Sequence, residues 1–112
     1  MDIVVEQRAP ATVVRISGSV DGLTADTLMA TLQQQIDVGN TRLIPDLSGV
    51  SYTSSAGLRA LLATVKQARS AGGDFRLAGV LPPVHKVLEM SGFTSILKLY
   101  PDVDGAVASY PA

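Results

Sequence analysis

The sequence predicts an α/β fold: a small domain with a mixed five-stranded sheet and about four helices. Two short β-branched runs at the amino end are joined by a tight turn, which is typical of an antiparallel hairpin. After them, apolar runs of strand length alternate with segments of helical periodicity. Strands that alternate with helices usually pair in parallel through right-handed crossovers. We therefore expect an antiparallel first strand and mostly parallel pairing in the rest of the sheet.

Length and composition indicate a single domain that spans residues 1–112. Hydrophobic residues make up 46% of the chain and charged residues 17%, a balance typical of globular proteins. The formal net charge is -1 and both signs are interspersed, which disfavours a nucleic-acid partner. The chain has no cysteine, no signal-peptide pattern at its start and no apolar run of membrane-spanning length. We expect a cytoplasmic protein without membrane insertion.

The amino-terminal hairpin is predicted to consist of strands at residues 3–7 and 11–17. In the second strand, Val14 and Ile16 lie on one face and Arg15 lies on the other. Because side chains alternate between the two faces of a strand, this pattern predicts that the second strand is half buried.

The first helix is predicted to begin after Thr24, a residue type that commonly caps helices. Asp26 then lies in the first turn, where the helix dipole favours an acidic side chain. Gly39 is a natural left-handed stop. Between these signals, the apolar residues recur at helical spacing: Ala25, Leu28, Met29, Leu32 and Ile36.

The third strand and second helix are predicted at residues 41–47 and 55–70. Pro45 cannot donate to a ladder, so we expect a local bulge or an early end to pairing near it. The helix ends at the glycine pair 72–73. Its apolar stripe is formed by Leu58, Leu61, Leu62, Val65 and Ala68.

The carboxy-terminal part of the chain predicts two further strands and two further helices. A strand is expected at residues 75–80, and a helix begins at the proline pair 82–83 and stops at Gly92. A short strand is expected at residues 96–99, and a last helix at residues 102–110.

Two adjacent serines, Ser54 and Ser55, lie at the predicted start of the second helix. Free backbone N–H groups and the positive end of the helix dipole favour an acceptor oxygen or an anion there. One interpretation is that one serine only caps the helix. The other is a phosphoacceptor, because a phosphate on Ser55 would face those N–H groups. At 100° per residue, Arg59 and Lys66 lie within about 40° of Ser55 around the helix.

The motifs do not favour an enzyme. Ser55 is the candidate nucleophile of a serine hydrolase, but its context differs from Gly-x-Ser-x-Gly and His85 is the only histidine. No glycine-rich phosphate loop is present. We therefore predict no catalytic residues, no cofactor and no metal. The acidic residues that we considered as ligands also lack the sequence spacing of a known metal site. These residues are Asp21, Asp46, Asp102 and Asp104.

Three stretches, residues 46–58, 17–25 and 84–93, together resemble the STAS domain of bacterial anti-sigma factor antagonists. They occur in the expected order, and the resemblance covers nearly the whole chain. The resemblance implies a small mixed sheet with four helices and a partner switch. In such a switch, the unphosphorylated antagonist binds an anti-sigma factor that is also a serine kinase, and so frees the sigma factor. A metal-dependent PP2C-type phosphatase resets the switch.

The family's phosphoacceptor follows an aspartate in an Asp-Ser-Ser/Thr-Gly turn, and it maps onto Ser55. Here Ser54 replaces the aspartate and Ala56 replaces the next Ser or Thr. Loss of the carboxylate removes a fixed charge beside the hydroxyl and leaves Ser54 as the second candidate acceptor. We expect a monomer or weak dimer whose partner surface comprises Asp21, Gly22, Thr24, Ser54, Ser55, Ala56, Gly57, Arg59 and Lys66.

The resemblance also leaves a second function open. STAS subunits are found on the ATPases of lipid-transport ABC complexes, where the same helix start is an assembly surface that needs no phosphate. Only the analogy with the family supports this alternative.

Overall fold

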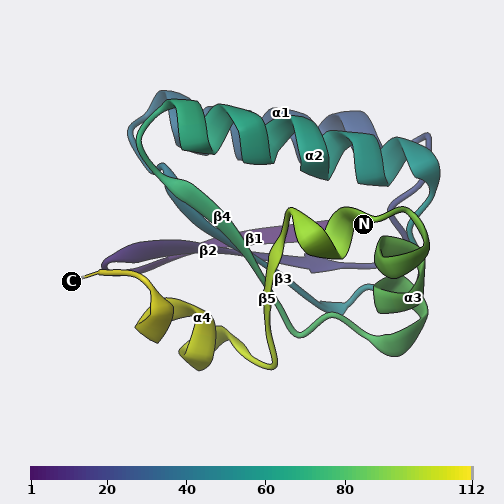
Figure 1. The fold of residues 1–112 in the computed structure, drawn as a ribbon. Coiled ribbons are helices and arrows are strands. Elements are labelled where there is room, and N and C mark those ends of the chain that lie inside the picture. Colours follow the sequence, from purple (N-terminus) through teal and green to yellow (C-terminus); the bar gives the residue numbers. More distant parts are fainter. Residues whose placement is uncertain (112) are drawn as a thin grey trace.

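One five-stranded sheet with helices on both faces forms the domain in the computed structural model, which describes residues 1–111 (Figure 1). The strand order follows the sequence; the first pair is antiparallel and the other three pairs are parallel. This confirms the predicted α/β fold. The elements are β1 (Asp2–Arg8), β2 (Ala11–Ser17), α1 (Ala25–Asp37), β3 (Arg42–Gly49), α2 (Ser55–Ser70), β4 (Asp74–Ala78), α3 (Pro82–Met90), the 3-10 helix η1 (Phe93–Ser95), β5 (Lys98–Tyr100) and α4 (Val103–Ser109).

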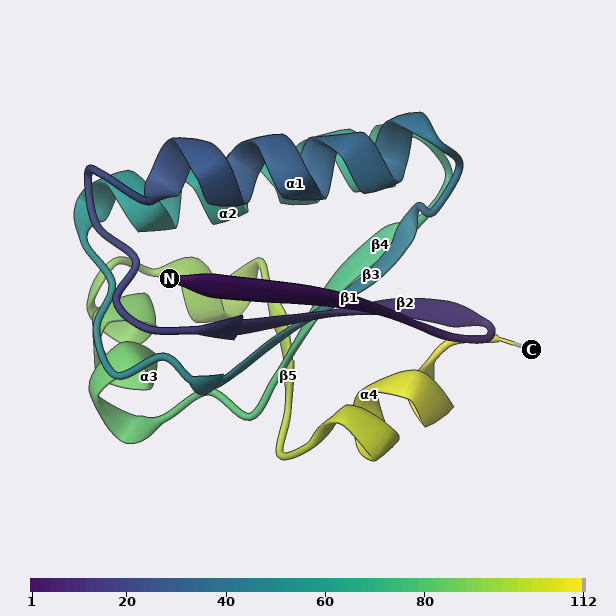
Figure 2. The ribbon, with the colours of Figure 1, turned by 180° about the vertical axis from the view of Figure 1, so that it is seen from behind.

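The sheet separates the core into two parts, one on each of its faces. Helices α1 and α2 lie side by side over one face of the sheet, and α4 lies on the other face (Figures 1 and 2). The larger core fills the space beneath α1 and α2, and α3 adds Val84 and Leu88 to it. The smaller core lies beneath α4 and consists of Ala11, Val13, Ile44, Ala78, Ala106 and Tyr110.

The prediction that β2 is half buried is wrong for its first four residues. Val14 and Ile16 face the larger core as expected, but Val13 is also fully buried, because α4 covers the opposite face. Only the end of the strand, at Arg15 and Ser17, is exposed on that face.

The irregularity expected near Pro45 is present one residue further along β3. Pro45 is buried in the central strand and is paired with Val14. The next pair joins Arg15 to Asp46, after which Ser17 pairs with Gly49, so β3 uses one residue more than β2. This is the pattern of a β-bulge, which bends a strand and ends its regular pairing. It lies just before the loop that leads into α2.

Every strand except β2 differs from its predicted bounds by one or two residues, and two of these differences have a clear local cause. The last strand begins at Lys98 rather than residue 96, because the preceding residues form η1, closed by a 3.0 Å hydrogen bond from Ile96 N–H to Phe93 O. The fourth strand ends at Ala78, because Gly79 turns into the left-handed region with φ 65°.

The carboxy-terminal helix α4 is held to the sheet by polar contacts as well as by its apolar face. Asp102 caps it, with Oδ1 accepting from Gly105 N–H at 2.7 Å. The Tyr110 hydroxyl donates to Leu43 O at 2.8 Å, and the Arg76 guanidinium stacks 4.1 Å from the centre of the Tyr110 ring. Burial raises the pKa of the Tyr110 hydroxyl, so it stays protonated as a donor.

Candidate partner-binding site

The two loops that precede α1 and α2 are joined to each other. They leave the carboxyl ends of the neighbouring parallel strands β2 and β3, which meet at one edge of the sheet. Val20 and Thr53 form an isolated bridge between the loops. Val20 N–H donates to Tyr52 O at 3.0 Å, and Ser54 N–H donates to Val20 O at 2.8 Å. The starts of both helices therefore belong to one continuous surface.

The two serines have different roles at the start of α2. Ser54 is the N-cap with an extended backbone, and its Oγ accepts from Gly57 N–H at 3.2 Å. Ser55 is the first residue of the helix and is exposed. Within residues 1–111, the Ser55 hydroxyl has no hydrogen-bond partner. Ser54 is therefore the residue that caps α2. The Ser55 hydroxyl is exposed to solvent and is not used in the cap.

The loop before α1 is closed by Asp21 and Thr24. Asp21 Oδ1 accepts from Leu23 N–H at 2.9 Å and from Thr24 N–H at 3.1 Å. Thr24 occupies the N-cap position, but its side chain makes no capping hydrogen bond to the helix. Its Oγ1 instead donates to Ser19 O at 3.0 Å and accepts from Asp21 N–H at 2.9 Å. Thr24 therefore fixes the shape of the loop, which corrects the prediction that it caps α1.

Gly57 is buried at the point where α2 passes the two loops. A Cβ atom at this position would collide with Thr53 Oγ1 and would lie 2.7 Å from Val20 Cγ1. Real Cβ contacts at such distances force neighbouring atoms to move. Although Gly57 was predicted as a partner contact, it supports the surface from beneath and does not face solvent.

A shallow groove of about 310 Å³ runs between α1 and α2 beside the helix starts. Arg59 lies at this groove, is exposed, and forms no ion pair within residues 1–111. Lys66 is exposed too, but 11 residues along α2 place it about 16 Å from Ser55. The structure therefore separates Lys66 from the helix start. The groove is lined by Gly22, Ala25, Asp26, Met29, Ala56, Arg59, Ala60 and Ala63.

Two exposed apolar side chains lie in the two joined loops and were not among the predicted site residues. Leu23, in the loop before α1, is 91% exposed, and Tyr52, in the loop before α2, is 54% exposed. Aromatic and aliphatic side chains in this setting are typical of protein interfaces. The available signal was a large apolar residue in each of two otherwise small and polar loops.

Neither a hydrogen-bonded pair of Ser55 and His85 nor a three-ligand metal site is formed in the part of the chain that the structure describes. His85 lies on α3, where its Nδ1 is 3.0 Å from Glu89 Oε1, and it makes no contact with Ser55. Residues 1–111 contain no group of three acidic or histidine side chains placed to hold a metal ion. Nor does any helix in this range have the length and apolar character needed to cross a membrane.

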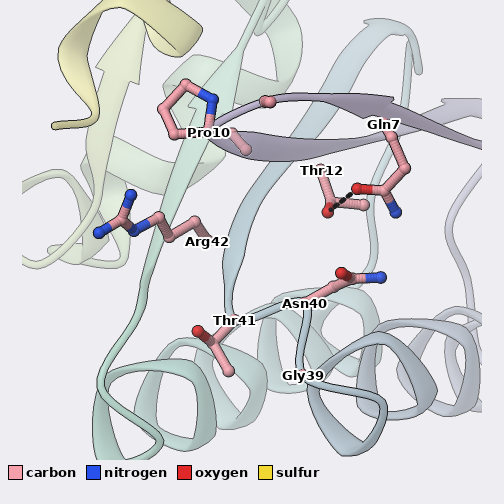
Figure 3. Close-up of a pocket in the computed structure, with 9 residues that line it drawn as sticks. Gln7, Pro10, Thr12, Gly39, Asn40, Thr41 and Arg42 are labelled. Carbon is pink, nitrogen blue, oxygen red and sulfur yellow. Dashed lines mark hydrogen bonds between the residues drawn. The ribbon is translucent and has the colours of Figure 1, made fainter. Parts of the chain in front are cut away.

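A second concave region lies at the opposite end of the sheet (Figure 3). It has a volume of about 330 Å³ and lies between the β1–β2 turn and the loop from α1 to β3. Its polar groups are already paired in part: Thr12 Oγ1 donates to Gln7 Oε1 at 2.9 Å, and Arg42 Nη1 donates to Pro111 O at 2.9 Å. It contains neither of the serines and none of the groups that interact with them.

Comparison with known proteins places this fold and this helix start in a family. The model of the STAS domain family matches residues 2–106. The chain belongs to the STAS domain family. An anti-sigma factor antagonist of Bordetella bronchiseptica, BtrV, is 38% identical over 95 residues, which cover 85% of this chain and 82% of BtrV.

Solved STAS structures agree with the fold. The crystal structure of an anti-sigma factor antagonist from Mycobacterium paratuberculosis has a TM-score of 0.88 and 28% identity, covering 96% of this chain and 92% of that one. Bacillus SpoIIAA in its unphosphorylated form has a TM-score of 0.80 and 20% identity, covering 99% and 100% of the two chains. Its phosphorylated form has a TM-score of 0.74 and 19% identity, covering 97% and 100%. At these identities, the likeness to SpoIIAA concerns the fold alone.

Proposed function

We propose that this STAS protein is an anti-sigma factor antagonist that acts as a phosphorylation-controlled partner switch. In its unphosphorylated form it binds an anti-sigma factor with serine kinase activity, which then releases its sigma factor. Phosphorylation of Ser55 ends this binding, and a PP2C-type phosphatase restores it. The protein itself acts by binding rather than by catalysis, in the cytoplasm.

The observation that carries this proposal is the state of the Ser55 hydroxyl. It is exposed at the first position of α2 and unpartnered within the described residues, whereas the neighbouring Ser54 is engaged as the helix cap. A kinase needs an accessible hydroxyl, and modification of Ser55 leaves the cap in place. The printed name of BtrV supports the antagonist function, while the choice of Ser55 depends on the geometry of the helix start.

The geometry also explains how a phosphate on Ser55 switches binding without unfolding the domain. Phosphorylation adds a charge of about -2 at pH 7. Inside the protein, this charge lies at the positive end of α2 and one helical turn from Arg59, so the fold tolerates it. On the partner side, the charge must be desolvated in an interface that also covers the exposed apolar side chains of Leu23 and Tyr52 in the two joined loops. Phosphorylation therefore weakens the binding of the partner and leaves the stability of the domain largely unchanged.

Phosphate mapping tests the proposal directly. The protein is incubated with its cognate anti-sigma factor kinase and with ATP, and the modified residue is located by mass spectrometry. We expect one phosphate on Ser55 and loss of kinase binding in the phosphorylated form. The Ser55→Ala variant should accept no phosphate and should stay bound. Ser70→Ala, which changes an exposed serine at the other end of α2, is the matched control and should behave as the wild type.

Two results would contradict this function. The first is a Ser55→Ala variant that is still phosphorylated, at Ser54 or elsewhere, and still released. The second is a pull-down with native partners that recovers only the ATPase of a lipid-transport ABC complex, which would favour the assembly subunit instead.

A further inference from the structure

Strand β1 forms one edge of the sheet. It lies at the end of the strand order and pairs only with β2, so alternate N–H and C=O groups along its outer side are unpaired within the sheet. Figure 2 shows β1 as the foremost strand in that view. With seven residues it extends about 24 Å. Two of its apolar side chains are exposed, Val4 at 58% and Val5 at 37%.

We propose that two copies of this chain pair antiparallel along β1, centred on Val5, and so form a continuous ten-stranded sheet. A two-fold axis that relates antiparallel edge strands stands perpendicular to the sheet and passes beside one central residue. With Val5 at the centre, all seven residues of one β1 face residues of the other. Val5 then lies opposite its own copy, and its exposed side chain is covered.

The charges along β1 select this register. Centring on Val5 places Asp2 of each copy opposite Arg8 of the other, which gives two oppositely charged cross-strand pairs. Centring on Val4 would place Asp2 opposite Glu6, and centring on Glu6 would place two glutamates opposite each other. Both alternatives bring like charges together and leave part of the strand unpaired. Centring on Gln7 would also give two opposite-charge pairs, between Glu6 and Arg8, but would pair only three residues. The register centred on Val5 is therefore the one that combines the longest pairing with complementary charges.

The existing contacts of these charged side chains are compatible with the pairing. Arg8 Nη2 already lies 2.7 Å from Asp104 Oδ1 of its own chain. A guanidinium carries five N–H donors, so Arg8 can bind Asp104 and an opposite carboxylate together. Asp2 is exposed at the end of the strand and forms no ion pair within residues 1–111. The carboxylate of Asp2 on a second copy is therefore available to pair with Arg8.

The interface is small, so the dimer is weak and depends on concentration. Pairing of single edge strands falls at or below the lower limit of stable interfaces, about 1,200 Å² of total buried area. This inference goes beyond the proposed function, because β1 carries none of the residues of the Ser55 surface. It holds or fails whatever the identity of the kinase.

Sedimentation equilibrium tests the pairing. Across about 10 μM to 1 mM protein, the weight-average mass should rise from 11.7 kDa toward twice that value. Asp2→Arg places like charges at both ends of the interface and should raise the dissociation constant about tenfold or more. Asp37→Arg, an exposed charge change at the end of α1, is the matched control and should dimerise as the wild type does.

A charge exchange between two variants gives the decisive result. The second variant is Arg8→Asp combined with Asp104→Arg, which keeps an oppositely charged pair within the chain. Alone, neither this variant nor Asp2→Arg should dimerise, whereas their mixture should form a heterodimer with both cross-strand pairs attractive. Circular dichroism and thermal melting confirm that each variant is folded. A wild type that remains monomeric throughout, a dimer indifferent to Asp2→Arg, or a mixture that does not associate would each overturn the proposal.

Discussion

The neighbouring serines at the start of α2 look equivalent in the sequence, and the backbone makes them different. Ser54 has φ -88° and ψ 173°, so its side chain turns back to the helix and accepts from Gly57 N–H. Ser55 is already the first residue of the helix, and Gly57 N–H donates to Ser54 rather than to Ser55. An aspartate at residue 54, as the family motif has, would cap the helix equally well. The serine found here preserves the cap and removes a negative charge next to Ser55.

This division predicts different stability effects for the two alanine substitutions. Ser54→Ala removes the capping acceptor and should lower the free energy of unfolding by about 1 kcal/mol. Ser55→Ala breaks no hydrogen bond in the described residues and should change it by less than about 0.5 kcal/mol. Urea denaturation followed by circular dichroism measures both, and Ser54→Asp should retain the wild-type value. Equal losses for the two alanine variants would contradict the assignment of the cap.

Helix α2 and the two loops beside it depend on the absence of a side chain at residue 57. The glycine lets the helix approach Val20 and Thr53, whose bridge joins the loops. A glycine in a helix is less favourable than alanine by about 1 kcal/mol. At this position the close approach of the helix to the loops requires it. The position of Ser55 relative to the loop before α1 follows from that contact.

Gly57→Ala should therefore destabilise the protein although alanine is the better helix former. The added Cβ collides with Thr53 Oγ1 and crowds Val20, and overpacking of this kind costs about 1 to 3 kcal/mol. We also expect weaker binding to the kinase, because the two loops are forced apart. Gly22→Ala is the control for stability alone, since its Cβ would meet no atom within 4 Å. A more stable Gly57→Ala variant would show that the loops can relax.

Across the domain, one carboxylate connects the end of α2 with the last two strands. Asp74 accepts from Arg69 at 2.9 Å, from Arg76 at 3.1 Å and from Lys98 at 3.1 Å. Partial burial acts to raise the pKa of Asp74, but hydrogen bonds from Arg69, Phe75 N–H, Lys98 and Arg76 outweigh it. They hold the pKa well below its ordinary value.

The depressed pKa of Asp74 predicts a stability difference that depends on pH. Because the folded-state pKa is lowered, the contribution is present above the unfolded-state pKa of about 4 and is lost as pH falls below it. Asp74→Asn should lower the free energy of unfolding by about 1 to 2 kcal/mol at pH 7, less than for a fully buried pair because Arg69 and Lys98 are partly exposed.

Urea denaturation of the wild type and Asp74→Asn at neutral pH and near pH 3 measures this difference. The two curves should move closer together in acid, because the carboxyl of Asp74 takes up a proton in the unfolded wild type while it stays ionised in the folded protein, and this lowers the free energy of unfolding of the wild type alone. Asp102→Asn, a charge change at an exposed helix cap, is the comparison variant. A gap between wild type and Asp74→Asn that widens in acid would contradict the role given to this carboxylate.

The sequence predicts best those elements for which several local signals agree. Helix α2 has the predicted bounds, because a capping residue, an apolar stripe and a glycine pair all indicate them. The burial of Val13 was missed, because it depends on α4, which joins β2 only in the folded chain. The late start of β5 was missed because Ile96 and Leu97, which suit a strand, donate their N–H groups to Phe93 O at the end of η1 instead.

The candidate site was predicted in part for the same reason. Local signals placed Ser55 at the start of α2, where the structure has it, and the role of Ser55 stays a prediction. They could not decide which serine caps α2, since that depends on backbone dihedral angles. Helical angle alone placed Lys66 near Ser55, but distance along the axis separates them. Leu23 and Tyr52 become apparent as a pair only when the bridge between their loops is known.

The bridge between Val20 and Thr53 has a consequence for the kinetics of recognition. Loops that order themselves only on binding lose conformational entropy at that moment, which weakens affinity and slows association. Here, hydrogen bonds within the free protein already fix both loops to each other. Association with a partner should therefore resemble the docking of rigid bodies. Differences in affinity among related kinases should then lie mainly in the dissociation rate of each complex.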